Sequence, residues 1–400
     1  MSVRLRKQQQ RSLAVADSNN HRVLLYPNLR DFPAPLSAVV EGPPFPTNES
    51  ATVALGQFDF IQNSANQGGG ASVNTLNAPS GVAVDSARGL VVLDTGNCRA
   101  LQFQPPFSTG MAAALVIGEP SFVATDCLRG ATATPSSLFT PTGAAFDSSG
   151  NLWIADFGDS RILEFVPPFS NGMAASLVMG QTSLTGSAGC NQGLGTATAS
   201  TLCSPHQITF DQAGNLWVAD YGNNRVLEFV SPFSNGMAAM LELGQPAGNP
   251  FTTITPNGNG VSAQSLNAPI QPRFDSRGNL WVSDSGNNRV LEFVPPFSNG
   301  MPARLELGQP AGPNGFNTNT PGTTRSTFHT PAGIAFGTRG ELLISDSNNN
   351  RVLMFVGSFR EGQSASTVLG QANFTSGAVN QGGAPDANTL AGPIGVVDIR

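Results

Sequence analysis

Short hydrophobic runs separated by turn residues recur along the whole chain. In one unit they fall at 141–147, 151–156, 161–165 and 174–179. Such runs are four to seven residues long, rich in β-branched and aromatic side chains, and bounded by Gly, Asn, Asp or Pro. No segment carries a ten-residue helical stripe. The pattern therefore predicts four short strands in each unit and no helices.

The units repeat at a nearly fixed interval. Each ends in Gly-Gln, or in one case Gly-Glu, at positions 56–57, 118–119, 180–181, 244–245, 308–309 and 370–371. The glycines are 62, 62, 64, 64 and 62 residues apart. A period this regular indicates an array of structural repeats, and four-stranded units repeated radially are the blades of a β-propeller.

The two ends of the chain complement each other. Residues 12–17 align with the second strand of the other units, whereas the first strand of that unit appears in 390–400. Pairing the two ends in one blade closes the ring and leaves no long exposed sheet edge. We therefore predict an all-β protein: a single six-bladed β-propeller of four-stranded blades over 11–400. One blade is shared between 11–57 and 390–400, and 1–10 form an N-terminal overhang.

Two recurring phrases resemble the NHL repeat: Ala-Asp-x-Gly-Asn-Asn-Arg-Val-Leu-Glu-Phe and Pro-x-Gly-[Val/Ile]-Ala-[Val/Phe]-Asp. The resemblance covers essentially the whole chain from about residue 11, and the long form ending in Leu-Gly-Gln is similar to repeats of secreted or surface-associated bacterial NHL proteins. It implies a six-bladed propeller that most often binds a protein or a ligand. One enzyme branch, the peptidyl-hydroxyglycine amidating lyases, resembles this fold and places three zinc-binding histidines around the central cavity.

The charge balance bears on partners and location. A net charge of −6 and a pI near 5.1 argue against nucleic-acid binding, which needs a clustered basic surface. The basic cluster of Arg4, Arg6, Lys7 and Arg11 is interpreted as a frayed end. No apolar run predicts a membrane span, and no secretory signal is present in this sequence. Composition, cysteines and family resemblance still favour an extracellular or cell-envelope location.

Four cysteines lie at Cys98, Cys127, Cys190 and Cys203. Their spacing contains no CxxC pair and so matches no zinc signature. Disulfides between Cys190 and Cys203 and between Cys98 and Cys127 would suit an oxidising compartment. The alternative is four unpaired thiols in a cytosolic protein.

An aspartate and an arginine recur five residues apart in every unit, separated by turn residues. The pairs are Asp17/Arg22, Asp94/Arg99, Asp156/Arg161, Asp220/Arg225, Asp284/Arg289 and Asp346/Arg351. The carboxylate can accept backbone amides of the turn while the arginine bridges back to it. Because every unit has the pair, we interpret it as an element of the fold. Trp153, Trp217 and Trp281 share one strand position and predict packing between blades.

Catalytic signatures are weak. The three histidines, His21, His206 and His329, occupy three different repeat positions and should not converge on one metal ion. The channel-facing positions offer too few carboxylates for a calcium site, and no GxSxG, HExxH or phosphate-binding glycine loop occurs. We therefore expect no metal, no cofactor and no enzymatic activity.

One face of the innermost strand changes character in two blades. The positions of Gly143 and Ala145 hold small residues in four blades, but Gln207/Thr209 and Gln271/Arg273 in blades four and five. Period-two alternation places these side chains in the central channel, with His206 near its mouth. Two amides and a guanidinium suit a carboxylate or a sugar. The alternative is a hydrated channel wall without a ligand.

Long polar loops connect the blades, at 181–204, 246–266 and 310–328, and an insertion at 31–50 lengthens blade one. Loops on a rigid scaffold are usual places for recognition. The sequence therefore favours a non-enzymatic binding or scaffold propeller that recognises a protein, peptide or glycan through these loops or the channel mouth. The alternatives are a self-assembling extracellular structural protein and a channel-site lyase or hydrolase of the NHL or lactonase-like type.

Overall fold

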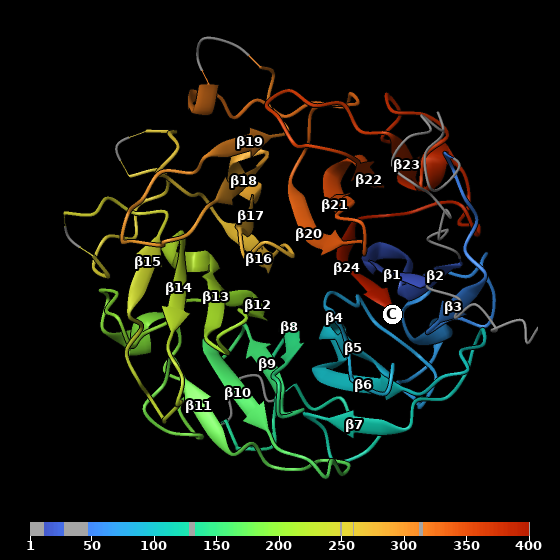
Figure 1. Cartoon of the computed structure of the whole chain (residues 1–400). Coiled ribbons are helices and arrows are strands. Elements are labelled where there is room, and N and C mark those ends of the chain that lie inside the picture. The colour runs from blue at the N-terminus through green and yellow to red at the C-terminus, as the bar shows by residue number, and fades with distance from the viewer. Residues whose placement is uncertain are drawn as a thin grey trace, which may run out of the picture.

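The computed structural model describes residues 12–27, 47–127, 133–248, 250–258, 260–311 and 315–399. These residues form six four-stranded antiparallel sheets arranged radially as a ring (Figure 1). The described residues contain short 3₁₀ turns but no α-helix. The predicted all-β, six-bladed propeller is confirmed. The basic cluster at 4–11 and most of the insertion at 31–50 lie outside the described residues.

Each blade runs from an innermost strand near the ring axis to a three-residue outermost strand. Blades 1 to 3 consist of β24 (Pro393–Ile399), β1 (Ser12–Asp17), β2 (Arg22–Pro27) and β3 (Val53–Leu55); β4 (Val82–Val84), β5 (Leu90–Asp94), β6 (Arg99–Phe103) and β7 (Leu115–Ile117); and β8 (Pro141–Phe146), β9 (Leu152–Asp156), β10 (Arg161–Phe165) and β11 (Leu177–Met179). Blades 4 to 6 consist of β12 (Pro205–Phe210), β13 (Leu216–Asp220), β14 (Arg225–Phe229) and β15 (Leu241–Leu243); β16 (Pro269–Phe274), β17 (Leu280–Asp284), β18 (Arg289–Phe293) and β19 (Leu305–Leu307); and β20 (Pro331–Phe336), β21 (Leu342–Asp346), β22 (Arg351–Phe355) and β23 (Thr367–Leu369).

Strands from the two ends of the chain close the ring. β24 pairs with β1 in antiparallel register, with Leu13 opposite Asp398 and Val15 opposite Val396. The C-terminal strand is therefore the innermost strand of the blade whose other strands come first in the sequence. Gly395 also donates its amide to the carbonyl of Ser80 in blade 2, at 2.8 Å. Hydrogen bonds thus tie the last strand both to its own blade and to the next one.

The hydrophobic core lies between the blades. Each of six clusters of buried apolar residues draws on two neighbouring blades. Trp153 of blade 3 is fully buried against Phe210 and Phe233 of blade 4, with ring centroids 5.8 and 5.0 Å away. Trp217 and Trp281 repeat this arrangement one and two blades later. The predicted packing of the tryptophans between blades is confirmed.

The free edge of the outermost strand is hydrogen-bonded by a loop of the next blade. The side chain of Asn171 accepts from the amide of Val116 at 3.0 Å, and Gly172 donates its amide to the carbonyl of Val116 at 3.0 Å. The same contacts recur at 178 with 235–236 and at 242 with 299–300. Because an unpaired strand edge is a template for aggregation, the repeated Ser-Asn-Gly-Met phrase protects the outer rim.

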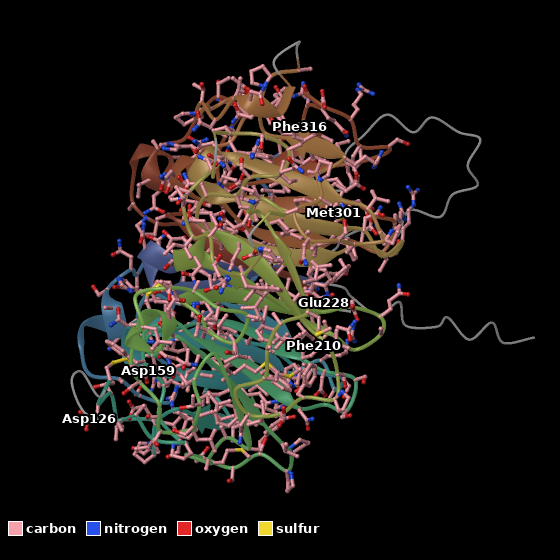
Figure 2. The ribbon with its side chains drawn as sticks, turned by 90° about the vertical axis from the view of Figure 1, so that its left-hand side faces the viewer. Asp126, Asp159, Phe210, Glu228, Met301 and Phe316 are labelled. Atoms are coloured by element: carbon pink, nitrogen blue, oxygen red, sulfur yellow. A yellow bond between two sulfur atoms is a disulfide. The ribbon has the colours of Figure 1, made fainter. Side chains whose placement is uncertain are left out.

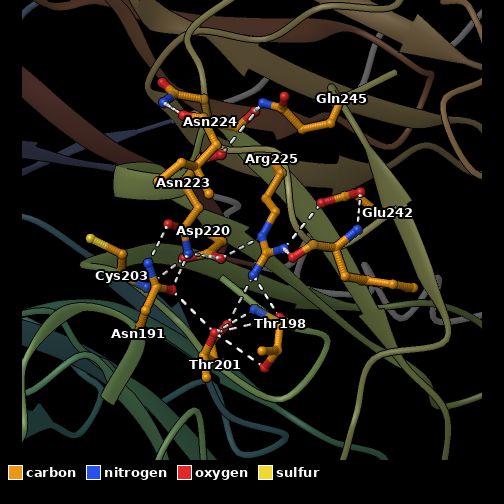
Figure 3. A network of polar contacts seen from close by, with 12 residues as sticks. Asn191, Thr198, Thr201, Cys203, Asp220, Asn223, Asn224, Arg225, Glu242 and Gln245 are labelled. Atoms are coloured by element: carbon orange, nitrogen blue, oxygen red, sulfur yellow. Dashed lines mark hydrogen bonds and ion pairs between the residues drawn. The ribbon is translucent and has the colours of Figure 1, made fainter. Parts of the chain in front are cut away.

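The Asp–Arg pair joins the two middle strands of a blade to its loops, as blade 4 illustrates (Figure 3). Asp220 accepts from Nε of Arg225 through Oδ2 and from the amide of Cys203 through Oδ1, each at 2.7 Å. The Arg225 guanidinium donates to the carbonyl of Thr201 before the blade at 3.0 Å, and to that of Phe251 after it at 2.8 Å. One buried pair therefore holds both connecting loops.

The same pair occurs in all six blades, with Asp and Arg side chains fully buried and Oδ2 and Nε 2.7 Å apart. In blades 4 and 5 the arginine also contacts a buried glutamate, Glu242 or Glu306, at 3.1 Å. Glu242 accepts from the amide of Phe251 at 2.6 Å, so it also holds the loop that follows blade 4.

Two disulfides reinforce the loops: Cys98–Cys127 and Cys190–Cys203, the two pairs named from the sequence. Cys98 has a left-handed backbone (φ +54°) at the turn position that Asn224 holds in blade 4. There Asn224 donates to the carbonyl of Ile254 in the outgoing loop at 2.9 Å. In blade 2 a covalent bond therefore replaces the hydrogen bond that fixes the equivalent loop.

Removing one member of an Asp–Arg pair tests how much the fold depends on it. Arg225→Met leaves the buried carboxylates of Asp220 and Glu242 without their cation, and we expect the free energy of unfolding to fall by about 3–5 kcal/mol. Urea denaturation followed by tryptophan fluorescence measures the loss. The double variant Asp220→Asn/Arg225→Met removes both charges and should lose less than the sum of the single variants. Unchanged stability of Arg225→Met would contradict this role.

Candidate functional site

A cavity of about 530 Å³ lies at one end of the central channel, where the innermost strands end. Most of its wall consists of Val, Ala and Phe side chains from blades 1 to 5. Besides Ser86, the polar members of the wall are Asp85, Arg88, Thr209, Gln271, Arg273 and Asp398. We call these six residues the channel site. Phe210, which also lines the cavity, and Asp159 lie on opposite faces of the propeller (Figure 2).

Three of the predicted site residues line this cavity: Thr209, Gln271 and Arg273. Thr209 and Arg273 occupy the same position of neighbouring innermost strands, each opposite a buried tryptophan of the second strand. The side chain of Gln271 accepts the amide of Ile334 in blade 6 at 2.7 Å. That bond links blades 5 and 6 and holds the Gln271 amide in one orientation.

Gln207 lies outside the cavity wall, although it occupies the same repeat position as Gln271. Its side-chain amide donates to the carbonyl of Thr142 in blade 3 at 2.8 Å. Innermost strands approach each other closely at this position, where blade 3 has a glycine. A Cβ on Gly143 would lie 2.3 Å from the carbonyl oxygen of His206, so that strand cannot carry a larger residue here. Gln207 therefore serves as a connection between blades 3 and 4.

His206 is the second residue of β12. The strand ends four residues later at Phe210, which borders the cavity. Its ring packs against Phe157 and Tyr221, with centroids 6.0 and 5.9 Å away. Its Nδ1 atom is buried without a hydrogen-bond partner. Desolvation by burial lowers the pKa of His206 to about 4, so the ring is neutral at pH 7. The structure thus places His206 apart from Arg273.

The remaining channel-site residues come from blades 1 and 2, and the sequence reasoning missed them. Asp398 stands where the other innermost strands hold Val84 or a phenylalanine. Arg88 has a left-handed backbone (φ +71°) at a turn position that is glycine in other blades, such as Gly150 (φ +82°). That conformation costs a non-glycine residue about 1 kcal/mol, and such strain is often retained at functional sites. Both departures from the repeat were visible in the sequence.

The channel site combines hydrogen-bond donors and acceptors. Arg88 and Arg273 supply guanidinium donors, Asp85 and Asp398 supply carboxylate acceptors, and Thr209 can do both. The Asp85 carboxylate is held in place because it accepts from the amide of Gly89 and the side chain of Gln102, each at 2.6 Å. The arrangement suits a ligand that carries a carboxylate and hydroxyl groups.

A metal centre has no support in the part of the chain that the structure describes, where no three His, Cys, Asp or Glu side chains form a cluster able to hold an ion. His21 instead accepts the amide of Ala78 through Nδ1 at 2.9 Å. His329 donates its backbone amide to Asp346 at 2.6 Å.

Comparison with known proteins agrees with the repeat pattern. The NHL repeat family model matches residues 202–229 and 328–355, which contain the Asp–Arg pairs of blades 4 and 6. The chain thus contains NHL repeats in blades 4 and 6 of its six-bladed β-propeller. No curated protein sequence matches it significantly.

Several solved structures resemble this NHL-repeat propeller. A Bacteroides caccae protein of unknown function has 9% sequence identity and a TM-score of 0.52, with 98% of this chain and 100% of that chain covered. A chain of a nidogen/laminin complex has 13% identity and a TM-score of 0.50, with 98% of each chain covered. The periplasmic gluconolactonase of Pseudomonas aeruginosa has 12% identity and a TM-score of 0.49, with 98% and 99% covered. At these identities the likeness concerns the fold alone.

The sequence-based expectation that the protein is not an enzyme is corrected by this comparison. A gluconolactonase is among the structures similar to the NHL-repeat propeller, so enzymatic activity is possible for this fold. The absence of familiar catalytic motifs does not exclude it. The 12% identity assigns no reaction to the chain.

In the part of the chain that the structure describes, no helix has the length and hydrophobicity of a membrane span.

The partly buried His206 predicts a dependence of stability on pH. Because burial lowers the pKa of His206 to about 4, the stability that its neutral ring contributes is present above its ordinary pKa of 6.5 and is lost as the pH falls towards 4. We expect His206→Phe, which keeps the aromatic packing, to lose less thermal stability than the wild type between about pH 7 and pH 4.5. Melting curves over this range test it, with neutral pH as the reference. Parallel losses in both proteins would contradict the assignment.

Proposed function

We propose that this NHL-repeat propeller binds an acidic carbohydrate in the channel site. The observation that carries the proposal is the position of Arg273 in the cavity wall, together with Gln271 and Thr209. The equivalent positions of blades 2, 3 and 6 carry alanine, Ala83, Ala145 and Ala335, and no other blade has a charged residue there. The fold therefore does not require an arginine there, whereas a ligand carboxylate does.

The chemistry of the wall favours a carbohydrate acid over a simple anion. A guanidinium binds a carboxylate through two parallel hydrogen bonds. Hydroxyl groups need acceptors as well as donors, and the carboxylates of Asp85 and Asp398 supply acceptors at the same cavity. Phenylalanine rings 146, 210 and 274 provide apolar surface beside them. The volume of about 530 Å³ lies within the range of roughly 300–1,000 Å³ usual for small-ligand sites.

As part of this proposal we place the protein outside the cytoplasm, in the extracellular space or the cell envelope. The disulfides Cys98–Cys127 and Cys190–Cys203 support that location, because disulfides persist in oxidising compartments. Acidic carbohydrates of surface polymers would be accessible to the protein there.

The direct test is calorimetric titration of the protein with glucuronate and galacturonate. We expect Arg273→Ala to weaken uronate binding by about tenfold to a hundredfold, because it removes charge-assisted hydrogen bonds worth roughly 1.5–3 kcal/mol. Arg273→Lys keeps the charge but lacks the planar guanidinium, so its uronate affinity should lie between those of the wild type and Arg273→Ala. Arg325→Ala, an exposed arginine outside the cavity, is the matched control.

Two results would overturn the proposal: unchanged uronate binding by Arg273→Ala, or equally tight binding of uncharged glucose by the wild type. Circular dichroism and the melting temperature show whether each variant is folded. The same samples are analysed for new products by mass spectrometry, because a bound uronate in this fold is a candidate substrate as well as a ligand.

Arg88→Gly tests whether the strained turn serves the channel site. We expect the free energy of unfolding to rise by about 0.5–1 kcal/mol. Glycine adopts the left-handed turn without strain, and this gain exceeds the larger loss of chain entropy that glycine undergoes on folding. Uronate affinity should fall at the same time, because one guanidinium leaves the cavity. Denaturation and titration of the same preparation measure both effects. A stabilised variant with full uronate affinity would separate Arg88 from the ligand.

A further inference from the structure

A second concave site lies beside the channel, between blades 5 and 6. This groove has a volume of about 420 Å³, and its wall includes Arg277, Arg304 and Arg339. We call it the arginine groove. Arg277 lies in the hairpin between β16 and β17, Arg304 directly before β19, and Arg339 in the hairpin between β20 and β21. Two blades therefore supply the three guanidinium groups.

The arginines of the chain are unevenly distributed. Among the described residues, the arginines outside the Asp–Arg pairs are Arg88, Arg273, Arg277, Arg304, Arg325, Arg339 and Arg360. The first two line the channel cavity and the arginine groove holds three more. Most of the cationic side chains that the fold does not bury thus belong to these two sites, in a protein with a net charge of −6.

The repeat provides an internal comparison for the groove. The equivalent groove between blades 2 and 3 is formed by the same repeat positions, which there hold Ala87, Ala114 and Ser149. The equivalence of Ala114 and Arg304 is direct, since each donates its amide to the third strand of its blade at 2.7 Å. The propeller therefore forms this groove without arginines, and the three guanidinium groups are an addition specific to blades 5 and 6.

The acidic residues of the arginine groove are already engaged within blade 5. Asp275 accepts from the amide and side chain of Asn279, each at 2.9 Å. Glu292 accepts from the side chain of Asn279 at 3.0 Å and also from Arg304. The Arg304 side chain is nevertheless 58% exposed. Because a guanidinium has five N–H donors, Arg304 keeps further donors for a ligand in the groove.

The groove continues the channel site along one segment of chain. Arg273 and Phe274 line the cavity, and Asp275, Ser276 and Arg277 line the groove directly after them. A linear ligand that enters the cavity at Arg273 therefore meets Arg277 next. Hydroxyl groups of Ser276, Thr338 and Ser358 alternate with the arginines in the groove wall. Like the cavity, the groove thus offers partners for both carboxylates and hydroxyls.

We propose that the arginine groove binds the continuation of the same ligand, which is therefore a uronic-acid oligosaccharide and not a single sugar. This inference rests on the proposed function and extends it. One uronate residue occupies the channel site, and the carboxylates of the following residues pair with Arg277, Arg304 and Arg339. A charged chain of several residues gains affinity because its second contact is intramolecular.

The test compares galacturonate with oligogalacturonates of increasing length by calorimetric titration. We expect the oligosaccharide to bind wild-type protein about tenfold or more tightly than the monomer, and this gain to shrink as salt is added. The variant Arg277→Ala/Arg304→Ala/Arg339→Ser copies the residues of the groove between blades 2 and 3. It should lose the gain from chain length and keep the monomer affinity. Arg325→Ala should behave as the wild type. If the triple variant is unstable, the single variant Arg304→Ala, at an exposed position, should show a smaller loss of the gain from chain length.

The outcomes separate the two proposals. If the monomer binds but the oligosaccharide is no tighter, or if the triple variant keeps the gain, the groove assignment is overturned and the channel site stands. If the triple variant loses oligosaccharide binding while Arg273→Ala does not affect it, the groove binds the chain and the channel proposal fails. If polyglutamate displaces the oligosaccharide at equal charge, the ligand is an acidic peptide and the carbohydrate assignment is overturned.

Discussion

The buried Asp–Arg pair is the interaction on which the rest of this propeller depends. A charge removed from water is tolerated only when its partner and its hydrogen bonds are complete, and each pair meets that condition with backbone groups of two loops. Because Arg225 contacts the loop before its blade and the loop after it, the pair fixes where the neighbouring blades begin. Burial raises the pKa of Asp220 and the Arg225 charge opposes that rise.

A repeated frame makes departures from the repeat informative, and the structure separates two kinds. Glu242 and Glu306 replace apolar residues of the outermost strand, but both are buried against the arginine of their own blade. Those departures serve the fold. Arg273 and Arg304 also depart from the repeat, yet they border a cavity or solvent and the equivalent positions fold with small residues. Those departures are the ones we assign to a ligand.

The propeller fold by itself does not identify a function, since one scaffold carries many sites. The similar solved structures include a protein of unknown function, a chain of a nidogen/laminin complex and a gluconolactonase, all at low identity. What distinguishes this chain is therefore local: a mixed-charge wall in the channel and a groove with three arginines next to it. Both lie on strand ends and hairpins, so the fold fixes the backbone that carries their side chains.

The sequence by itself determined the strands, the blades, the closure by both termini and the Asp–Arg pairs, because each is a local pattern repeated at a fixed period. Strand alternation also placed Thr209 and Arg273 in the channel wall. Tertiary structure decided the rest of the site. The side-chain amide of Gln207 donates to the carbonyl of Thr142 in blade 3, and His206 packs against Phe157 and Tyr221; the repeat period specifies neither contact. Asp398 joins the cavity and the three arginines share one groove only because the ring closes and places blades side by side, a juxtaposition that no sequence period encodes.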